Sequence, residues 1–259
     1  MKNLALTLNV AGWSDLEASR RLAEERGLGL EIQHFTHGLL LDGAWRAKAE
    51  EIKAALKGFK GTLSLHGPYE NLDPGAWDPQ VGALSRGRYI HAMQIADLLG
   101  ARIIVLHCWY WPTQKYHGGV PRWAERRIPA WQDLARTAEK FGVTLVAENV
   151  WEPDPSAQIA LIDGVNSPAL RACLDTGHAN MTGATSLPQW IEQLGPRLVY
   201  VHAHNNCGAS DDHWPFDRGT LDMKSVIAKL ANQPAPPRVC LELRSFADQQ
   251  TSLGVIDSI

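Results

Sequence analysis

Residues 170–180 read LRACLDTGHAN, a short apolar run that ends on a carboxylate and, three residues later, an imidazole. A short apolar run is typical of a buried strand, and Gly177 then favours a sharp turn. Asp175 and His178 therefore stand where a parallel strand would end. Taken alone, this pair fits a metal site and a hydrogen-bonded structural pair equally well, so the rest of the chain must distinguish them.

Similar apolar runs recur along the chain and alternate with longer amphipathic stretches. We expect strands at Leu4–Val10, Leu30–His34, Thr62–His66, Arg102–His107, Val143–Glu148, Leu170–Asp175, Leu198–His202 and Arg238–Glu242. Helical patterns lie between them, at residues 14–26, 44–57, 80–99, 123–141, 156–163, 187–194, 222–231 and 245–258, several of them ending at a glycine. Eight strands alternating with eight helices predict an α/β fold, a single-domain (β/α)8 TIM barrel over residues 1–259. An open doubly wound sheet is the alternative, and it is disfavoured because no glycine-rich phosphate fingerprint follows the first strand.

Composition narrows the class of protein. The net charge of −3 offers no basic surface for nucleic acid or anionic lipid. The four cysteines form no CxxC pair, which argues against a zinc ribbon or a disulfide scaffold and suits the reducing cytoplasm. The start, MKNLALTLNVAG, is a weak signal peptide and a better first strand, and no run approaches the length of a membrane span.

Carboxylates and imidazoles follow the third to the eighth expected strands, where a barrel of this kind carries its chemistry. We expect nine such residues to converge at one mouth: His66, His107, Glu148, Asp175, His178, His202, Asp211, His213 and Glu242. A capping role is the simpler explanation for one strand but not for six in a row. Crowded carboxylates without partners repel one another and are driven to protonate, and a divalent cation removes this cost. Donors of this kind without cysteine suit Mn, Mg, Zn, Co or Fe.

The sequence blocks HGPY, AEN, LDTGH, HAHNN…DDH and LELRS occur in this order from the third strand to the eighth. With them the chain resembles the xylose isomerase-like TIM-barrel superfamily, which includes sugar (phosphate) isomerases and epimerases and the endonuclease IV-like enzymes of AP endonuclease family 2. In the epimerase branch, the resemblance implies one metal ion held by Glu148, Asp175, His202 and Glu242. The two glutamates would also move protons, and His178 would contact the substrate. In the endonuclease branch, it implies that all nine residues hold three zinc ions.

The metal count and the rim of the mouth bear on this choice. Nine residues exceed the six to eight ligands that one ion takes, which favours more than one metal ion. The extra histidines can instead bind sugar hydroxyls or cap strands, so one ion is expected and up to three can be accommodated. An endonuclease must hold a DNA backbone, which favours lysine and arginine around the site. The strand-end loops are instead acidic, with four exceptions: Lys115, Arg122, Arg218 and Arg244. The rim therefore weakens the nuclease alternative without excluding it.

Aromatic residues crowd the same loops: Tyr69, Trp109, Tyr110, Trp111, Trp151 and Trp214. Aromatic rings stack on the apolar face of a sugar or on a base, and they can equally roof the barrel. The residues expected to bind substrate are His66, Tyr69, Trp109, Trp151, His178 and Arg244. Glu31 could bind a hydroxyl or support a neighbouring ligand. Structural roles are expected for His34, His37 and His91.

These observations predict a divalent-metal-dependent isomerase or epimerase of a small sugar or keto-sugar. Glu148 and Glu242 would pass a proton through an enediolate, one taking it and the other returning it. The alternative is metal-dependent hydrolysis of a phosphodiester by an abasic-site endonuclease. A third class, a barrel that binds without catalysis, is disfavoured because a buried pair of glutamates is costly to keep.

Overall fold

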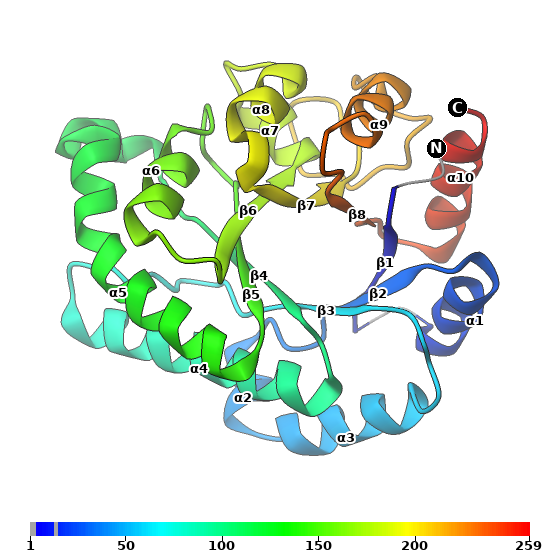
Figure 1. The fold of residues 1–259 in the computed structure, drawn as a ribbon, viewed down its shortest axis with the longest axis horizontal. Helices are drawn as coiled ribbons and strands as arrows, with labels where there is room; N and C mark the ends of the chain where they lie inside the picture. Colours follow the sequence, from blue (N-terminus) through cyan, green and yellow to red (C-terminus); the bar gives the residue numbers. More distant parts are fainter. Residues whose placement is uncertain (1–3, 13–14) are drawn as a thin grey trace.

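Eight parallel strands pair in chain order in the computed structural model, which describes residues 4–12 and 15–259. The strands are β1 (Leu6–Val10), β2 (Gly29–Ile32), β3 (Leu63–His66), β4 (Ile103–His107), β5 (Thr144–Glu148), β6 (Leu170–Asp175), β7 (Leu198–Ala203) and β8 (Arg238–Leu241). Pairing of β1 with β8, which sets Leu6 beside Val239, closes the sheet into a barrel (Figure 1). The predicted (β/α)8 barrel is thus confirmed.

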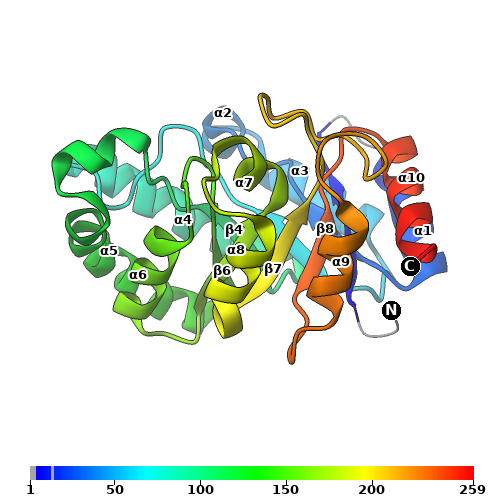
Figure 2. The ribbon, with the colours of Figure 1, turned by 90° about the horizontal axis from the view of Figure 1, so that it is seen from above.

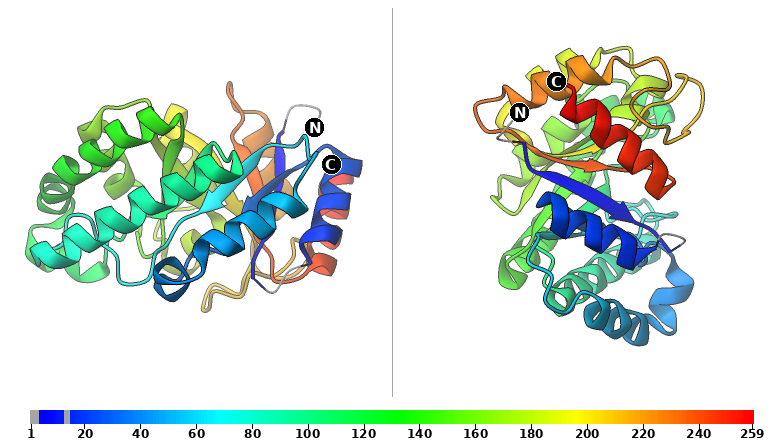
Figure 3. Two further views of the ribbon diagram at one scale, coloured as in Figure 1. Left: turned by 90° about the horizontal axis from the view of Figure 1, so that it is seen from below. Right: turned by 90° about the vertical axis from the view of Figure 1, so that its right-hand side faces the viewer.

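Helices surround the ring of strands. They are α1 (Leu16–Arg26), α2 (Gly38–Asp42), α3 (Trp45–Ala55), α4 (Pro79–Leu99), α5 (Gly119–Phe141), α6 (Ser156–Val165), α7 (Thr176–Thr182), α8 (Leu187–Leu194), α9 (Met223–Ala231) and α10 (Phe246–Asp257), with 3-10 turns at Pro112–His117 and Gly195–Arg197. The first and last helices lie near each other (Figure 3), and Arg26 pairs with Asp257 at 2.7 Å. Among the described residues, no helix is long and apolar enough to cross a membrane.

The helix ends follow the sequence signals. Gly27, Gly100 and Gly142 end α1, α4 and α5 with φ of 66°, 79° and 62°, a conformation that glycine adopts without strain. Asp15 caps α1 by accepting from the Ala18 amide at 2.9 Å. The first residue of the helix expected at 14–26 lies outside the described residues, as do residues 1–3.

Two short helices, α2 and α7, were not predicted. Helix α7 begins directly where β6 ends, because the Asp175 carboxylate accepts from the His178 amide at 2.6 Å and caps it. The sharp turn expected at Gly177 is therefore wrong. Gly177 is helical, and its lack of a side chain serves a close contact described below.

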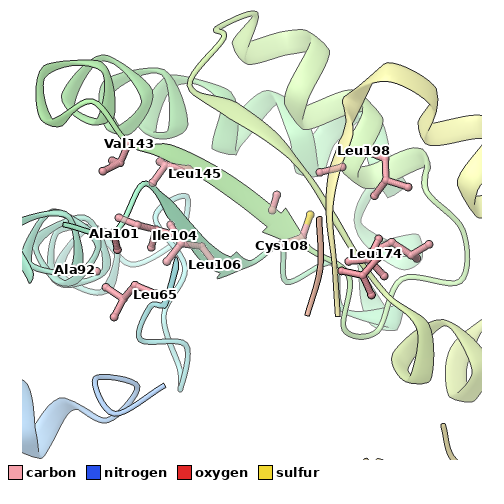
Figure 4. Close-up of a cluster of buried hydrophobic side chains, with 14 of the residues drawn as sticks. Leu65, Ala92, Ala101, Ile104, Leu106, Cys108, Val143, Leu145, Leu174 and Leu198 are labelled. Carbon is pink, nitrogen blue, oxygen red and sulfur yellow. The ribbon is translucent and has the colours of Figure 1, made fainter. Parts of the chain in front are cut away.

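The main hydrophobic core lies between the barrel and its helices. Figure 4 shows part of it, where Leu65 and Ile104 of the sheet face Ala92 of α4. Three tryptophans of the outer helices, Trp123, Trp131 and Trp190, are almost completely buried. Burial of such large apolar surfaces between strands and helices fixes the outer ring against the barrel.

A second, smaller core fills the barrel interior: Val105, Val146, Cys173, Tyr200 and Cys240. Side chains two residues apart on a strand point to the same face. The interior residue of each strand is therefore followed, one layer higher, by His107, Glu148, Asp175, His202 or Glu242. The two-residue period of the strands thus places the predicted site one layer above this interior core. The site lies at the end of the barrel from which the loop between β7 and α9 projects (Figure 2).

Candidate functional site

Four buried side chains meet at the carboxyl ends of β5–β8: Glu148, Asp175, His202 and Glu242. We call them the four-residue cluster. His202 Nδ1 lies 2.8 Å from Glu148 Oε1, 3.2 Å from Glu242 Oε2 and 4.0 Å from Asp175 Oδ2. One ligand atom from each residue falls within 4.8 Å of the others, a spacing that a single cation can span.

Glu31 supports this cluster from behind. His202 Nε2 lies 3.1 Å from both oxygens of the fully buried Glu31 carboxylate, so this nitrogen donates to Glu31 and Nδ1 faces the cluster. A carboxylate behind a histidine is the usual way to fix a metal-ligating ring. Gln33 donates to Glu31 at 2.8 Å and to Glu242 at 2.7 Å and so ties the two carboxylates together. Gln33 was not predicted, although it lies two residues after Glu31, on the same side of the chain.

Three further histidines are oriented by the backbone. The Nδ1 atoms of His66, His178 and His213 each lie 2.9 Å from a main-chain carbonyl oxygen, to which they donate. The Nε2 atoms are left to face carboxylates: Glu148 at 3.5 Å from His66, and Asp211 at 3.5 Å from His178 and 3.1 Å from His213. A fixed Nδ1–H and a free, inward Nε2 are what a metal-ligating histidine requires.

Charge is concentrated in this mouth. Burial lowers the pKa of His202, but Glu242, Glu31 and Glu148 outweigh it and hold the pKa well above the usual range. Burial raises the pKa of Glu148, but His202 and His66 outweigh it and hold the pKa well below the usual range. His107 is the exception, because burial lowers its pKa to about 3. Without a cation, imidazolium protons balance the carboxylates, and a bound cation would displace them.

Several buried polar atoms here have no hydrogen-bond partner among the described residues, including Glu148 Oε2, Asp211 Oδ1, His107 Nδ1 and His204 Nδ1. Such an atom costs about 1–3 kcal/mol if left unsatisfied, and coordination of an ion would remove that cost for a carboxylate oxygen or a ring nitrogen. Carboxylate oxygens and imidazole nitrogens suit Mn, Zn, Co, Fe and, less readily, Mg. The residues present therefore fit a divalent cation.

The loop between β7 and α9 delivers Asp211 and His213 to the mouth. Its path is held by the two asparagines of the HNN block. Asn205 exchanges hydrogen bonds with Leu221, at 3.0 Å in both directions, and Asn206 donates to the Gly177 carbonyl at 2.9 Å. All nine residues predicted from the strand ends thus come together, and His213 does so with a left-handed φ of 51°.

The mouth opens into two connected hollows that share His66, Tyr69, Asp211, His213 and Glu242. The larger lobe, of about 530 Å³, is walled by residues after β1, β2 and β8, among them Gln33, His34, His37 and Arg244. The aromatic lobe, of about 320 Å³, is walled by His107, Trp109, Trp111, Glu148, Trp151 and His178. Every predicted substrate-binding residue lines at least one lobe, and His34 and His37, expected to be structural, line one too.

The tryptophans of the aromatic lobe form a row. Trp111 stacks on Trp109 at 5.1 Å between ring centres and on Trp151 at 5.9 Å. Trp109 has a left-handed φ of 58°, which is strained for a bulky residue and is found mainly at functional sites. The other two aromatics expected here lie elsewhere. Tyr110 is buried edge-on against Trp123, and Trp214 packs under Arg218.

His204 is the main residue that sequence reasoning missed. It is fully buried, and its Nε2 lies 3.1 Å from the Asp175 carboxylate. The available signal was the spacing HAH, because residues two apart share a face of a strand. The expected strand ended at His202, so this spacing was not followed to His204, which lies one residue past the observed end of β7 at Ala203.

Fold and site together define a (β/α)8 barrel with a carboxylate–imidazole cluster at its mouth. A family model described as xylose isomerase-like TIM barrel matches residues 21–257, and the chain belongs to this family.

Solved structures agree over nearly the whole chain. The TTHB071 protein from Thermus thermophilus, soaked with ZnCl2, is 26% identical with a TM-score of 0.81, covering 98% of this chain and 97% of its own. A D-tagatose 3-epimerase-like protein is 19% identical with a TM-score of 0.81, covering 98% and 96%. A D-psicose 3-epimerase, solved in the presence of D-fructose, is 15% identical with a TM-score of 0.75, covering 98% of each chain.

Proposed function

We propose that this protein is a divalent-metal-dependent isomerase or epimerase of a small sugar or keto-sugar. The four-residue cluster carries the proposal, because Glu148, Asp175, His202 and Glu242 offer ligand atoms within 4.8 Å of one another at the mouth of a barrel. The names of two similar structures, a D-tagatose 3-epimerase-like protein and a D-psicose 3-epimerase, support the substrate class.

A bound divalent cation would supply Lewis-acid stabilisation of the negative charge that develops on substrate oxygens. Glu148 and Glu242 would act on the reacting carbon, one removing the proton beside the carbonyl and the other returning a proton. They stand on β5 and just after β8 and approach His202 from different strands. Glu148 Oε2 has no hydrogen-bond partner among the described residues and can take the proton, while Gln33 holds Glu242 Oε1.

The two lobes would bind the remainder of the sugar. His66, His178 and Arg244 offer polar contacts for hydroxyls, and Trp109 and Trp151, with Tyr69, offer apolar faces. A sugar presents both kinds of surface, which fits this mixed wall.

The four cysteines are all unpaired thiols, which supports our proposal of a reducing, cytoplasmic location.

Proton exchange with solvent tests this proposal. The protein with Mn²⁺ is incubated with a panel of ketoses and aldoses in D₂O, and the carbon-bound protons are followed by NMR. At least one sugar should gain deuterium beside its carbonyl. Glu148→Gln and Glu242→Gln should abolish the exchange while still binding metal, because glutamine can ligate through oxygen but cannot accept the proton. A sugar that turns over at full rate with the double variant would refute the two-glutamate mechanism.

Metal-dependent phosphodiester hydrolysis is the second candidate, favoured by the presence of all nine residues at the mouth. The walls oppose it, because Arg244 is the one lysine or arginine among the described residues lining the two lobes. Of the other basic residues noted in the loops, Lys115 lies over Tyr116, Arg122 over Trp77 and Arg218 over Trp214. We expect no incision of an abasic duplex with Zn²⁺ at low salt. Strong incision that Glu242→Ala abolishes would reverse the ranking.

A further inference from the structure

A further hollow adjoins the aromatic lobe and has no part in the proposed proton transfer. We call it the outer hollow. It measures about 510 Å³ and is walled by Tyr69, Glu70, Asn71, Leu72, Asp73, Trp109 and Trp111. Tyr69, Trp109 and Trp111 also line the aromatic lobe, so the two spaces share a wall of aromatic rings. A ligand held in the aromatic lobe therefore has room to continue into the outer hollow.

The combined space is larger than one small sugar needs. The two lobes of the mouth measure about 530 and 320 Å³. Each of the three spaces falls in the range of about 300–1,000 Å³ that a complete small-molecule site occupies. A monosaccharide held at the four-residue cluster would leave the outer hollow unused and Trp111, at its edge, 45% exposed. Trp111 belongs to a row of stacked tryptophans, and clustered exposed apolar surface of this kind marks a binding surface.

The walls of the outer hollow suit a neutral ring that carries hydroxyls. Trp109 and Trp111 lie nearly parallel, 12° apart, and such rings pack against the apolar face of a sugar. Glu70 and Asn71 are exposed in the same hollow, and between them they can accept from and donate to hydroxyl groups. No lysine or arginine is among the described residues that line it. A phosphate or carboxylate would therefore meet acidic groups without a cation to balance it.

The wall is fixed by contacts within the protein. The Asp73 carboxylate pairs with the buried guanidinium of Arg127, and the Asp73 amide donates to the Ser85 hydroxyl at 2.8 Å. Tyr69 stacks on His107 with 4.5 Å between the ring centres. A preformed wall loses little conformational entropy when a ligand binds, which favours affinity.

We propose that the outer hollow is a subsite for a second sugar ring, so that the substrate is a neutral glycoside of at least two rings. One ring would lie at the four-residue cluster, and the second would lie against Trp109 and Trp111 with its hydroxyls on Glu70 and Asn71. Tyr69 lines both lobes and the outer hollow, and the link between the two rings would pass beside it. The inference rests on the proposed function for the position of the reacting ring.

Isothermal titration calorimetry with paired sugars tests this subsite. The full chain, loaded with Zn²⁺, is titrated with D-fructose and with lactulose and isomaltulose, two disaccharides that contain it. D-glucose, cellobiose and maltose form a second set. At least one disaccharide should bind about tenfold more tightly than its parent monosaccharide, a difference of about 1.4 kcal/mol.

Two variants locate the second ring. Asn71→Gly and Trp111→Ala should each remove the advantage of the disaccharide. Asn71 lines neither lobe, so Asn71→Gly should leave the affinity for the monosaccharide unchanged. The φ of Asn71 is 56°, which glycine adopts readily, so this variant should fold. Trp77→Ala is the matched control, because Trp77 is 64% exposed, packs under Arg126 and lines none of the three hollows, and it should keep the advantage.

The outcomes separate this subsite from the proposed function. If no disaccharide binds more tightly than its parent, or if the advantage survives in Trp111→Ala, the subsite is overturned. A monosaccharide that exchanges deuterium beside its carbonyl, without any advantage for a disaccharide, overturns the subsite and leaves the proposed function standing. A disaccharide that shows the advantage and loses it in Asn71→Gly, but exchanges no deuterium, supports the subsite and counts against the proposed function.

Discussion

Gly177 leaves less room for an added Cβ than any other described glycine, and replacing it with alanine tests how His204 is held. An added Cβ would lie 1.9 Å from His204 Cε1, about 1.5 Å short of an ordinary 3.4 Å contact. The ring cannot slide away freely, because it stacks on His213 at 3.9 Å. Either the ring or α7 must move, and a shift of this size breaks the 3.1 Å hydrogen bond from His204 to Asp175.

The expected destabilisation follows from three contributions. Overpacking a close-packed site costs about 1–3 kcal/mol. Loss of a hydrogen bond to a charged group costs roughly 1.5–3 kcal/mol. Better helix propensity returns about 1 kcal/mol, because alanine replaces glycine in α7. The net loss is about 1.5–5 kcal/mol, which lowers the Tm by roughly 3–20 °C for a chain of this size.

Differential scanning calorimetry of the metal-free protein measures this loss. Gly87→Ala is the matched control, since Gly87 is an exposed glycine in α4 with no atom near its added Cβ, and it should raise the Tm slightly. In the double variant Gly177→Ala/His204→Ala the clash is gone. Its loss of stability should therefore be smaller than the sum of the losses in the two single variants. A Gly177→Ala protein with the wild-type Tm and metal count would refute the described packing of His204.

Three further predictions concern the metal and the walls. Glu31→Gln removes the carboxylate behind His202 and should weaken metal binding about 10–100-fold, measured by competition with a chromophoric chelator, whereas surface Glu51→Gln should leave it unchanged. In EDTA the free energy of unfolding should fall as pH rises from about 6.5 to 9, because His213 loses its proton. Burial lowers the pKa of His213, but the hydrogen bond to Asp211 and the charge of Glu242 raise it to about 9. With Zn²⁺ present, the free energy of unfolding should instead rise between pH 6.5 and 8, because protons compete with the metal for its ligands. Urea titrations that show the same pH dependence in EDTA and in Zn²⁺ would contradict this prediction. Trp109→Ala and Trp151→Ala should raise KM for a sugar substrate several-fold without changing metal content, as checked by steady-state kinetics and elemental analysis.

The barrel could be predicted because its strands are buried on both faces. Each reads as a short apolar run, and the expected ends differ from the observed ones by at most two residues, as at Leu30–His34 against Gly29–Ile32. The nine residues converge because the carboxyl ends of parallel strands all lie at one end of a barrel. Their position at or after the ends of the expected strands was therefore enough to predict that they meet.

Orientation could not be predicted in this way. The tautomers of His66, His178 and His213 depend on which carbonyl lies beside Nδ1, and that is set by tertiary packing. Gln33 lay inside the expected strand Leu30–His34, and His204 lay two residues after His202, so the two-residue period could have indicated both; neither was singled out, because only the carboxylate or imidazole at the expected end of each strand was considered. Helix α7 was missed because Asp175 serves both as its cap and as a cluster residue.

The four-residue cluster comes entirely from β5–β8, while much of the larger lobe is walled by residues 9–69. The proposed metal ligands and the wall of the larger lobe thus come mainly from different halves of the chain. Mutations in residues 9–69 can therefore remodel the wall of the larger lobe without replacing a residue of the four-residue cluster. Glu31 and Gln33 are the points where the two halves constrain each other, because they hydrogen-bond to His202 and Glu242. Exchange of residues 9–69 between relatives should therefore change the fit of the group held in the larger lobe, while the four-residue cluster and the aromatic-lobe contacts of Trp109, Trp151 and His178 stay in place.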